Sequence, residues 1–181
     1  MKLILSAVSI AVLLGACASM EQNAPKATSM LQPTKNNQAS GTVTFTQKGD
    51  KLLVEASLTG LAPGLHGFHI HEKGDCSSGD GMSTGGHFNP GSKHHAGPQH
   101  AEHHGGDLGN LNADNSGKAT LMLEIDGVTL DEGSNSVIGK GLIVHASADD
   151  FKTQPTGNSG ARVACGVINR VSASSSPSRS Y

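Results

Sequence analysis

The sequence of 181 residues has no tryptophan, one tyrosine and only four phenylalanines. Its formal net charge is −2 and it has no basic stripe, which argues against a general binder of nucleic acids or of membrane surfaces. Helical blocks of alanine, leucine and glutamate are missing, whereas glycine is plentiful, so the composition indicates strands joined by loops. No nucleophilic triad and no phosphate-binding motif stands out in the sequence.

Histidine is abundant in this otherwise aromatic-poor chain. The chain contains ten histidines, and nine of them fall between His66 and His104. The imidazole ring is the commonest metal ligand in proteins and suits zinc and copper. Because Asp107 adds a carboxylate three residues after His104, we expect a protein built around metal.

The first sixteen residues resemble a signal peptide of the lipoprotein type. Lys2 is followed by an apolar segment, residues 3–14, that is too short to span a bilayer. The segment Leu-Gly-Ala-Cys that ends at Cys17 resembles a bacterial lipobox, in which the cysteine is lipidated. We therefore expect a periplasmic protein tethered to a membrane through Cys17. Ordinary signal cleavage after Ala18 is the alternative, because Ala16-Cys17-Ala18 also fits such a site.

The three cysteines are consistent with export. With Cys17 assigned to the signal, Cys76 and Cys165 are left as a pair. An oxidising compartment predicts a disulfide between them. Two separate buried thiols are the alternative.

The composition also divides the chain into segments. Residues 17–38 are polar and contain Pro25 and Pro33, which predicts a flexible tether. Residues 172–181 are rich in serine and predict a disordered tail. The expected folded domain is residues 39–171.

Within this domain the hydrophobic period is two, which is typical of strands. Short segments rich in branched residues are bounded by glycine, proline or asparagine, and they predict an antiparallel sandwich or barrel. Two long segments, residues 73–109 and 147–161, directly follow strands that contain histidine and are predicted to be functional loops. The expected strands are residues 42–46, 51–58, 66–72, 119–125, 137–146 and 162–169.

The spacing of the histidines indicates two groups of ligands. His69 and His71 stand at positions i and i+2 of a strand, so both rings face the same side, although an exposed strand face would show this pattern too. His145 could add a third imidazole, although a single histidine in an apolar strand is more often simply buried. A closed set of three imidazoles and one carboxylate, as zinc accepts, is available further along the chain in His87, His95, His104 and Asp107.

Five segments of the sequence follow one another in a recognisable order: GLHGFHIHE (64–72), GHFNP (86–90), HGGDLGN (104–110), GLIVH (141–145) and GARVACG (160–166). Together they resemble the copper,zinc superoxide dismutases over nearly the whole domain. The spacing between His71 and Cys76 is similar to that of the bacterial periplasmic branch of this family.

The resemblance implies an all-β fold, a flattened eight-stranded Greek-key β-barrel, with one copper and one zinc per subunit. It also implies that His87 bridges the two metals, and that Asp149 accepts hydrogen bonds from the outer nitrogens of His69 and His95. The implied copper ligands are His69, His71, His87 and His145, and the implied zinc ligands are His87, His95, His104 and Asp107.

The implied activity is dismutation of superoxide to dioxygen and hydrogen peroxide by alternate reduction and oxidation of copper. His87 would act as a general acid and Arg162 would guide the anion. Lys73 is the candidate for additional electrostatic steering. The alternatives are a periplasmic copper- and zinc-binding lipoprotein or a copper chaperone without turnover, and an anchored interaction module. A monomer and a homodimer both remain open.

The other histidines are expected to have no catalytic role. His66 is interpreted as structural. His94, His100 and His103 match no ligand of the family and are expected to be solvated, with capture of metal from a poor supply as the alternative.

Overall fold

The computed structural model describes residues 24–172, and the expected signal segment with Cys17 lies outside this range, as do residues 173–181 of the expected tail. The described part is all-β, and its only helical element is the 3₁₀ turn η1, Met82–Thr84. No helix within the described residues is long and apolar enough to cross a bilayer. The strands are β1 Lys26–Pro33, β2 Ser40–Lys48, β3 Lys51–Thr59, β4 Gly64–His71, β5 Asp107–Ala113, β6 Ala119–Ile125, β7 Gly141–His145, β8 Arg162–Val167 and β9 Asn169–Arg170.

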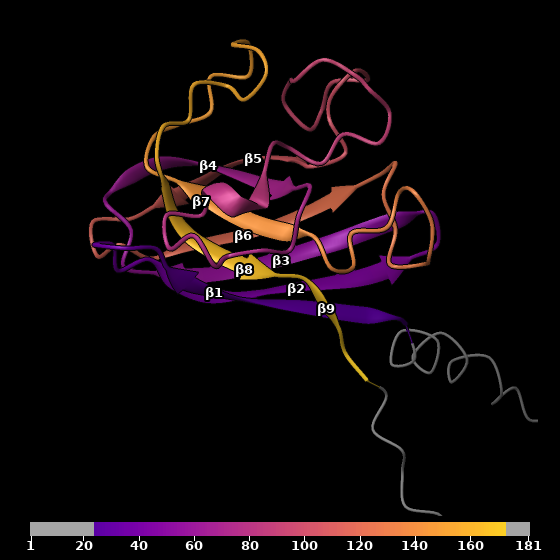
Figure 1. Cartoon of the computed structure of the whole chain (residues 1–181), viewed down its shortest axis with the longest axis horizontal. Coiled ribbons are helices and arrows are strands. Elements are labelled where there is room, and N and C mark those ends of the chain that lie inside the picture. Colours follow the sequence, from indigo (N-terminus) through magenta and orange to yellow (C-terminus); the bar gives the residue numbers. More distant parts are fainter. Residues whose placement is uncertain (1–23, 173–181) are drawn as a thin grey trace, which may run out of the picture.

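The strands form an antiparallel barrel that is nearly closed (Figure 1). Neighbours follow the order β5-β4-β7-β8-β1-β2-β3-β6, and the short β9 pairs with β1. The first and last strands of this order, β5 and β6, are joined directly by residues 114–118. The expectation of an all-β Greek-key barrel is therefore confirmed.

Alternation along the strands forms the core. In β3 every second residue points inward and is buried, whereas the alternate residues face outward; the inward residues are Leu52, Val54, Ala56 and Leu58. Strands β4 and β7 differ, because every residue of β7 and every residue of β4 from His66 to His71 is buried. Both faces of these two strands are covered, which allows them to hold histidines away from water.

The predicted flexible tether is wrong for residues 26–33. These residues form β1, which pairs with β2 over six residues, Lys26 to Leu31, and with β8 at Gln32 and Pro33. Ala27, Ser29 and Leu31 alternate into the interior. This alternation is hard to recognise in the sequence because two of its three inward residues are small. The folded domain therefore begins before residue 39.

Strand β5 was also not predicted, since its first residues were assigned to the loop 73–109. It begins at Asp107 and pairs with β4, so that His69 lies opposite Asp107. Two long connections remain, residues 72–106 between β4 and β5, and residues 146–161 between β7 and β8. In Figure 1 both connections extend from the part of the barrel formed by β4, β5, β7 and β8.

Candidate metal centre

Four histidines from three elements converge beneath the long loops. His69 and His71 lie on β4, His145 ends β7, and His87 is attached to the end of β4 through an isolated bridge with His71. One potential ligand atom from each of the four lies within 4.8 Å of the others, and all four residues are buried. We call these residues the four-histidine set.

Each member of this set has one buried ring nitrogen without a hydrogen-bond partner. A buried polar atom left in this way costs about 1–3 kcal/mol. Four such atoms in one place fit a cation site, because a cation would accept their lone pairs. The atoms are His69 Nδ1, His71 Nε2, His87 Nε2 and His145 Nε2.

The opposite ring nitrogens fix the tautomers. His71 Nδ1 lies 2.9 Å from the Gly85 carbonyl oxygen, and His145 Nδ1 lies 3.1 Å from the Gly160 carbonyl oxygen. A carbonyl oxygen can only accept, so each Nδ1 carries the proton and donates it. The unpartnered Nε2 of His71 and of His145 is therefore the unprotonated nitrogen, which is the form that binds a metal.

A second group surrounds Asp107, and we call it the mixed set: His87, His95, His104 and Asp107. Asp107 Oδ1 lies 2.9 Å from His87 Nδ1, 3.0 Å from His95 Nδ1 and 3.5 Å from His104 Nδ1. Its other oxygen accepts the backbone N–H groups of Ala96 and His104, which fixes the carboxylate. His87 belongs to both sets, with Nδ1 in the mixed set and Nε2 among the unpartnered atoms of the four-histidine set.

Asp149 connects the two sets from outside. Its Oδ2 accepts a hydrogen bond from His69 Nε2 at 2.7 Å, and its Oδ1 accepts one from His95 Nε2 at 2.9 Å. The carboxylate is buried, and Oδ1 also accepts the N–H of Phe151. Asn110 of β5 accepts the Asp149 N–H at 2.7 Å and donates to its carbonyl oxygen at 3.0 Å. The structure thus places Asp149 where the sequence resemblance implied.

Burial determines the charge of the four-histidine set. Desolvation lowers the pKa of His87 to about 4 and that of His145 to about 3, and it lowers the pKa of His71 well below its usual value. Burial also lowers the pKa of His95, but its hydrogen bonds with Asp107 and Asp149 outweigh burial and raise this pKa to about 9. At neutral pH His71, His87 and His145 are therefore neutral and able to bind a cation.

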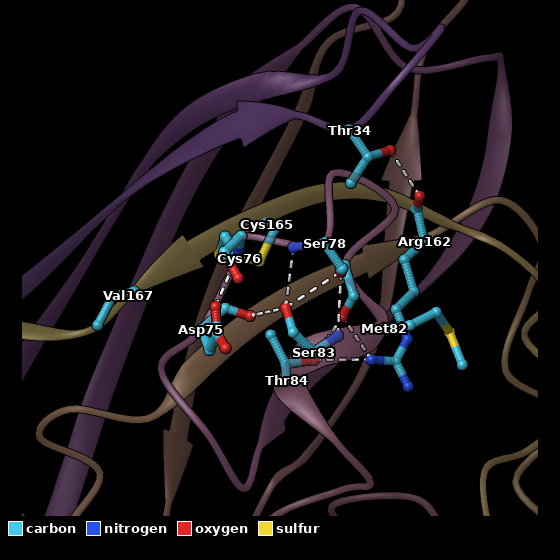
Figure 2. Close-up of a disulfide and its surroundings, with 12 residues drawn as sticks. Thr34, Asp75, Cys76, Ser78, Met82, Ser83, Thr84, Arg162, Cys165 and Val167 are labelled. Atoms are coloured by element: carbon cyan, nitrogen blue, oxygen red, sulfur yellow. Dashed lines mark hydrogen bonds between the residues drawn. A yellow bond between two sulfur atoms is a disulfide. The ribbon is translucent and has the colours of Figure 1, made fainter.

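Arg162 begins β8 and pairs with His145, the last residue of β7. Its side chain points toward Thr84 in the loop after β4 (Figure 2). Its Nη1 donates to the Gly81 carbonyl oxygen at 2.6 Å and to Thr84 Oγ1 at 2.7 Å. Its Nη2 donates to the Gly85 carbonyl oxygen at 2.8 Å, the same oxygen that accepts the bond from His71. This shared acceptor fixes the position of the guanidinium relative to His71.

A disulfide connects the same loop to the same strand. Cys76 and Cys165 are bonded, and Cys165 follows Arg162 by three residues on β8 (Figure 2). The expected pairing is therefore confirmed. It ties the loop that supplies the acceptors of Arg162 to the strand that carries this arginine.

The remaining histidines contribute to neither set within residues 24–172. The ring nitrogens of His66 lie 2.7 Å from the His145 carbonyl oxygen and 2.8 Å from the Ala62 carbonyl oxygen, which gives His66 the structural role expected from the sequence. His94 and His100 are exposed. The expectation that His103 is solvated is wrong, because its ring is buried and its Nδ1 forms a hydrogen bond with the His104 carbonyl oxygen.

Two charged residues near Arg162 were not among the predicted site residues. A depression of about 310 Å³ beside the arginine is lined by Lys35 and Asp80, among others. Lys35 follows the unpredicted strand β1, so no pattern in the sequence connected it with Arg162. Lys73, the predicted steering residue, does not line this depression.

The described residues form a nearly closed β-barrel with two buried groups of possible metal ligands that share one histidine, an arrangement typical of proteins that bind two neighbouring metal ions. The family model of the copper/zinc superoxide dismutases matches residues 39–168, and the chain belongs to this family. Among solved structures, it is similar to the crystal structure of the clock protein EA4, with 41% identity and a TM-score of 0.73. That match covers 81% of this chain and 94% of the other. The family implies copper and zinc as cofactors and superoxide as substrate.

Proposed function

We propose that the protein is an active superoxide dismutase that binds copper at the four-histidine set and zinc at the mixed set. The observation that carries the proposal is His87, whose two ring nitrogens belong to different ligand sets. Storage of a single metal does not need such a shared ring. A redox reaction that also moves protons can use a ring placed between two ions.

The donor atoms fit the two metals. The mixed set offers three imidazoles and a carboxylate, a closed four-coordinate arrangement that zinc accepts. The four-histidine set offers only imidazoles, which suit copper. When bound, copper would supply a one-electron change of oxidation state and zinc a fixed positive charge.

His87 is placed to supply a proton. The reaction converts two superoxide ions and two protons into one dioxygen and one hydrogen peroxide. His87 Nε2 faces no protein acceptor, whereas its Nδ1 remains beside Asp107. A proton held on Nε2 could be given to the departing peroxide, which is general acid catalysis.

Arg162 is placed to hold the anion. A guanidinium has five N–H donors, and three bonds to fixed oxygens use three of them. Two N–H groups therefore remain for a small anion, and the positive charge persists because arginine is not deprotonated in proteins. Lys35 and Asp80 also line this depression, so the positive charge of Lys35 offsets the negative charge of Asp80 and leaves the guanidinium as the net attraction for superoxide.

The test is a superoxide consumption assay on metal-loaded protein, with the copper content measured in each sample. Arg162→Ala should lower kcat/KM by about tenfold or more at unchanged copper content, because the anion loses its docking charge. Activity that falls only in proportion to lost copper would contradict the role of Arg162.

The second candidate function is copper and zinc binding without turnover. It is kept because a relative at 41% identity is named for a clock rather than for an enzyme. Fully loaded wild-type protein that does not consume superoxide would favour this function over dismutation.

We also propose that the protein is exported to the periplasm and lipidated at Cys17, on the strength of the sequence resemblance described above. Cells grown with radiolabelled palmitate should label the wild-type protein but not the Cys17→Ser variant. An unlabelled wild-type protein would instead support cleavage after Ala18.

A further inference from the structure

The backbone of His95 is held by an unexpected partner. His95 N–H donates to Gln154 Oε1 at 2.8 Å, and Gln154 Nε2 donates to the His95 carbonyl oxygen at 2.8 Å. The two residues are 59 positions apart and lie on the two different long loops. One amide side chain thus satisfies both peptide groups of a residue in the mixed set.

This pair of bonds matters because His95 lies outside regular structure. It belongs to the loop 72–106, so no strand ladder holds its peptide groups. Within the described residues, neither its N–H nor its carbonyl takes part in a backbone–backbone hydrogen bond. A segment held by few hydrogen bonds opens easily. The contribution of Gln154 to the position of His95 is therefore large for an exposed side chain.

The ring of His95 is held by residues 146–161, the loop that also contains Gln154. Asp149 accepts the bond from His95 Nε2, and Asp149 is itself held at its backbone by Asn110. Residues 146–161 therefore hold His95 at two points, the ring through Asp149 and the peptide through Gln154. Two points of attachment fix both the place and the direction of Nδ1, the nitrogen that faces Asp107.

We infer that Gln154 is a positioning residue that holds His95 ready for zinc. The inference rests on the proposed assignment of zinc to the mixed set. Groups that support metal ligands from outside commonly change metal affinity by about 10–100-fold when they are removed. Since Gln154 acts on the peptide rather than on the ring, we expect an effect near the lower end, about tenfold.

The experiment compares zinc release from full-length variants to a chromophoric chelator. Gln154→Met keeps the length of the side chain but removes both hydrogen bonds, and it should release zinc about tenfold faster than the wild type. Gln154→Glu keeps an acceptor for the His95 N–H but loses the donor, so its rate should lie between the two. Cobalt(II) placed at the mixed set should show an altered visible absorption spectrum in Gln154→Met, because His95 is directed differently.

The matched control is Gln47→Met. Gln47 also bonds backbone groups with its amide, at Gly49 and Leu130, but it lies on β2 away from both ligand sets. Its variant should release zinc at the wild-type rate. An equal acceleration in Gln47→Met would show a general loss of stability and overturn the inference.

Two further outcomes are distinguishable. If the wild type binds zinc but Gln154→Met releases it at the same rate and with an unchanged cobalt spectrum, the positioning role is wrong while the proposed function stands. If the wild type binds no zinc at the mixed set, the metal assignment fails first, and the inference fails with it.

Discussion

Replacing Asp149 with asparagine tests how strongly one carboxylate supports both ligand sets. Its two oxygens accept N–H bonds from His69 at 2.7 Å and from His95 at 2.9 Å, and both rings are fully buried. Asparagine has nearly the same shape but offers one oxygen and one NH2 group. One of the two imidazole N–H groups would then face another donor at hydrogen-bond distance.

The cost follows from these contacts. A hydrogen bond to a charged group contributes about 1.5–3 kcal/mol, and an unsatisfied buried donor costs about 1–3 kcal/mol. A loss of about 2 kcal/mol at one set corresponds to roughly 30-fold in metal affinity, since about 1.4 kcal/mol is tenfold. The ring that loses its acceptor determines which metal is weakened more.

Competition titrations with chelators of known affinity would measure copper and zinc binding separately. Asp149→Asn should weaken at least one metal by roughly 10–100-fold without removing a ligand. The control is Asp150→Asn, because Asp150 is exposed and its carboxylate accepts hydrogen bonds from Lys152 and Thr153 within its own turn. Unchanged affinity for both metals in Asp149→Asn, or equal weakening in Asp150→Asn, would refute the reasoning.

Three further predictions concern stability and substrate capture. The double variant Cys76→Ser/Cys165→Ser should lose up to about 4–5 kcal/mol of unfolding free energy in urea, because the bond closes a loop with a sequence separation of 89; an unchanged midpoint would contradict this. The metal-free protein should lose stability as the pH falls from 6.5 toward 4. In the folded protein the pKa values of His87 and His145 are about 4 and about 3, so the unfolded chain takes up more protons than the folded chain over this range. The free energy of unfolding should fall by at most about 1.4 kcal/mol per pH unit for each ring, and urea midpoints that do not change between these pH values would count against this prediction. If Lys73 steers the anion, Lys73→Ala should lower the dismutation rate and flatten its dependence on ionic strength. If instead Lys73→Ala leaves the salt dependence unchanged and Lys35→Gln has the larger effect, steering belongs to the depression beside Arg162.

The sequence by itself determined the class of fold and the candidate ligands. A period of two and turns rich in glycine define strands without reference to tertiary contacts. The spacing of His69 and His71 places both rings on one face of a strand for the same local reason. The ordered motifs implied membership of one family, and the match of that family's model to residues 39–168 shows this membership.

Some elements could not be predicted because their signal is weak. Strand β1 turns Ala27, Ser29 and Leu31 inward, and small or polar residues do not mark a buried face. Its place between β2 and β8 is decided by pairing with segments distant in sequence. The same is true of Lys35, which reaches the depression beside Arg162 only because β1 belongs to the barrel.

Only the tertiary structure decided which nitrogen each histidine presents and what holds it in place. The tautomers of His71 and His145 depend on the carbonyl oxygens of Gly85 and Gly160, which are 14 and 15 residues away in sequence. The bonds from Gln154 to His95 join loops without any repeating pattern. A hydrogen bond requires two atoms within about 3 Å in the correct direction, and the folded path of the chain sets that geometry.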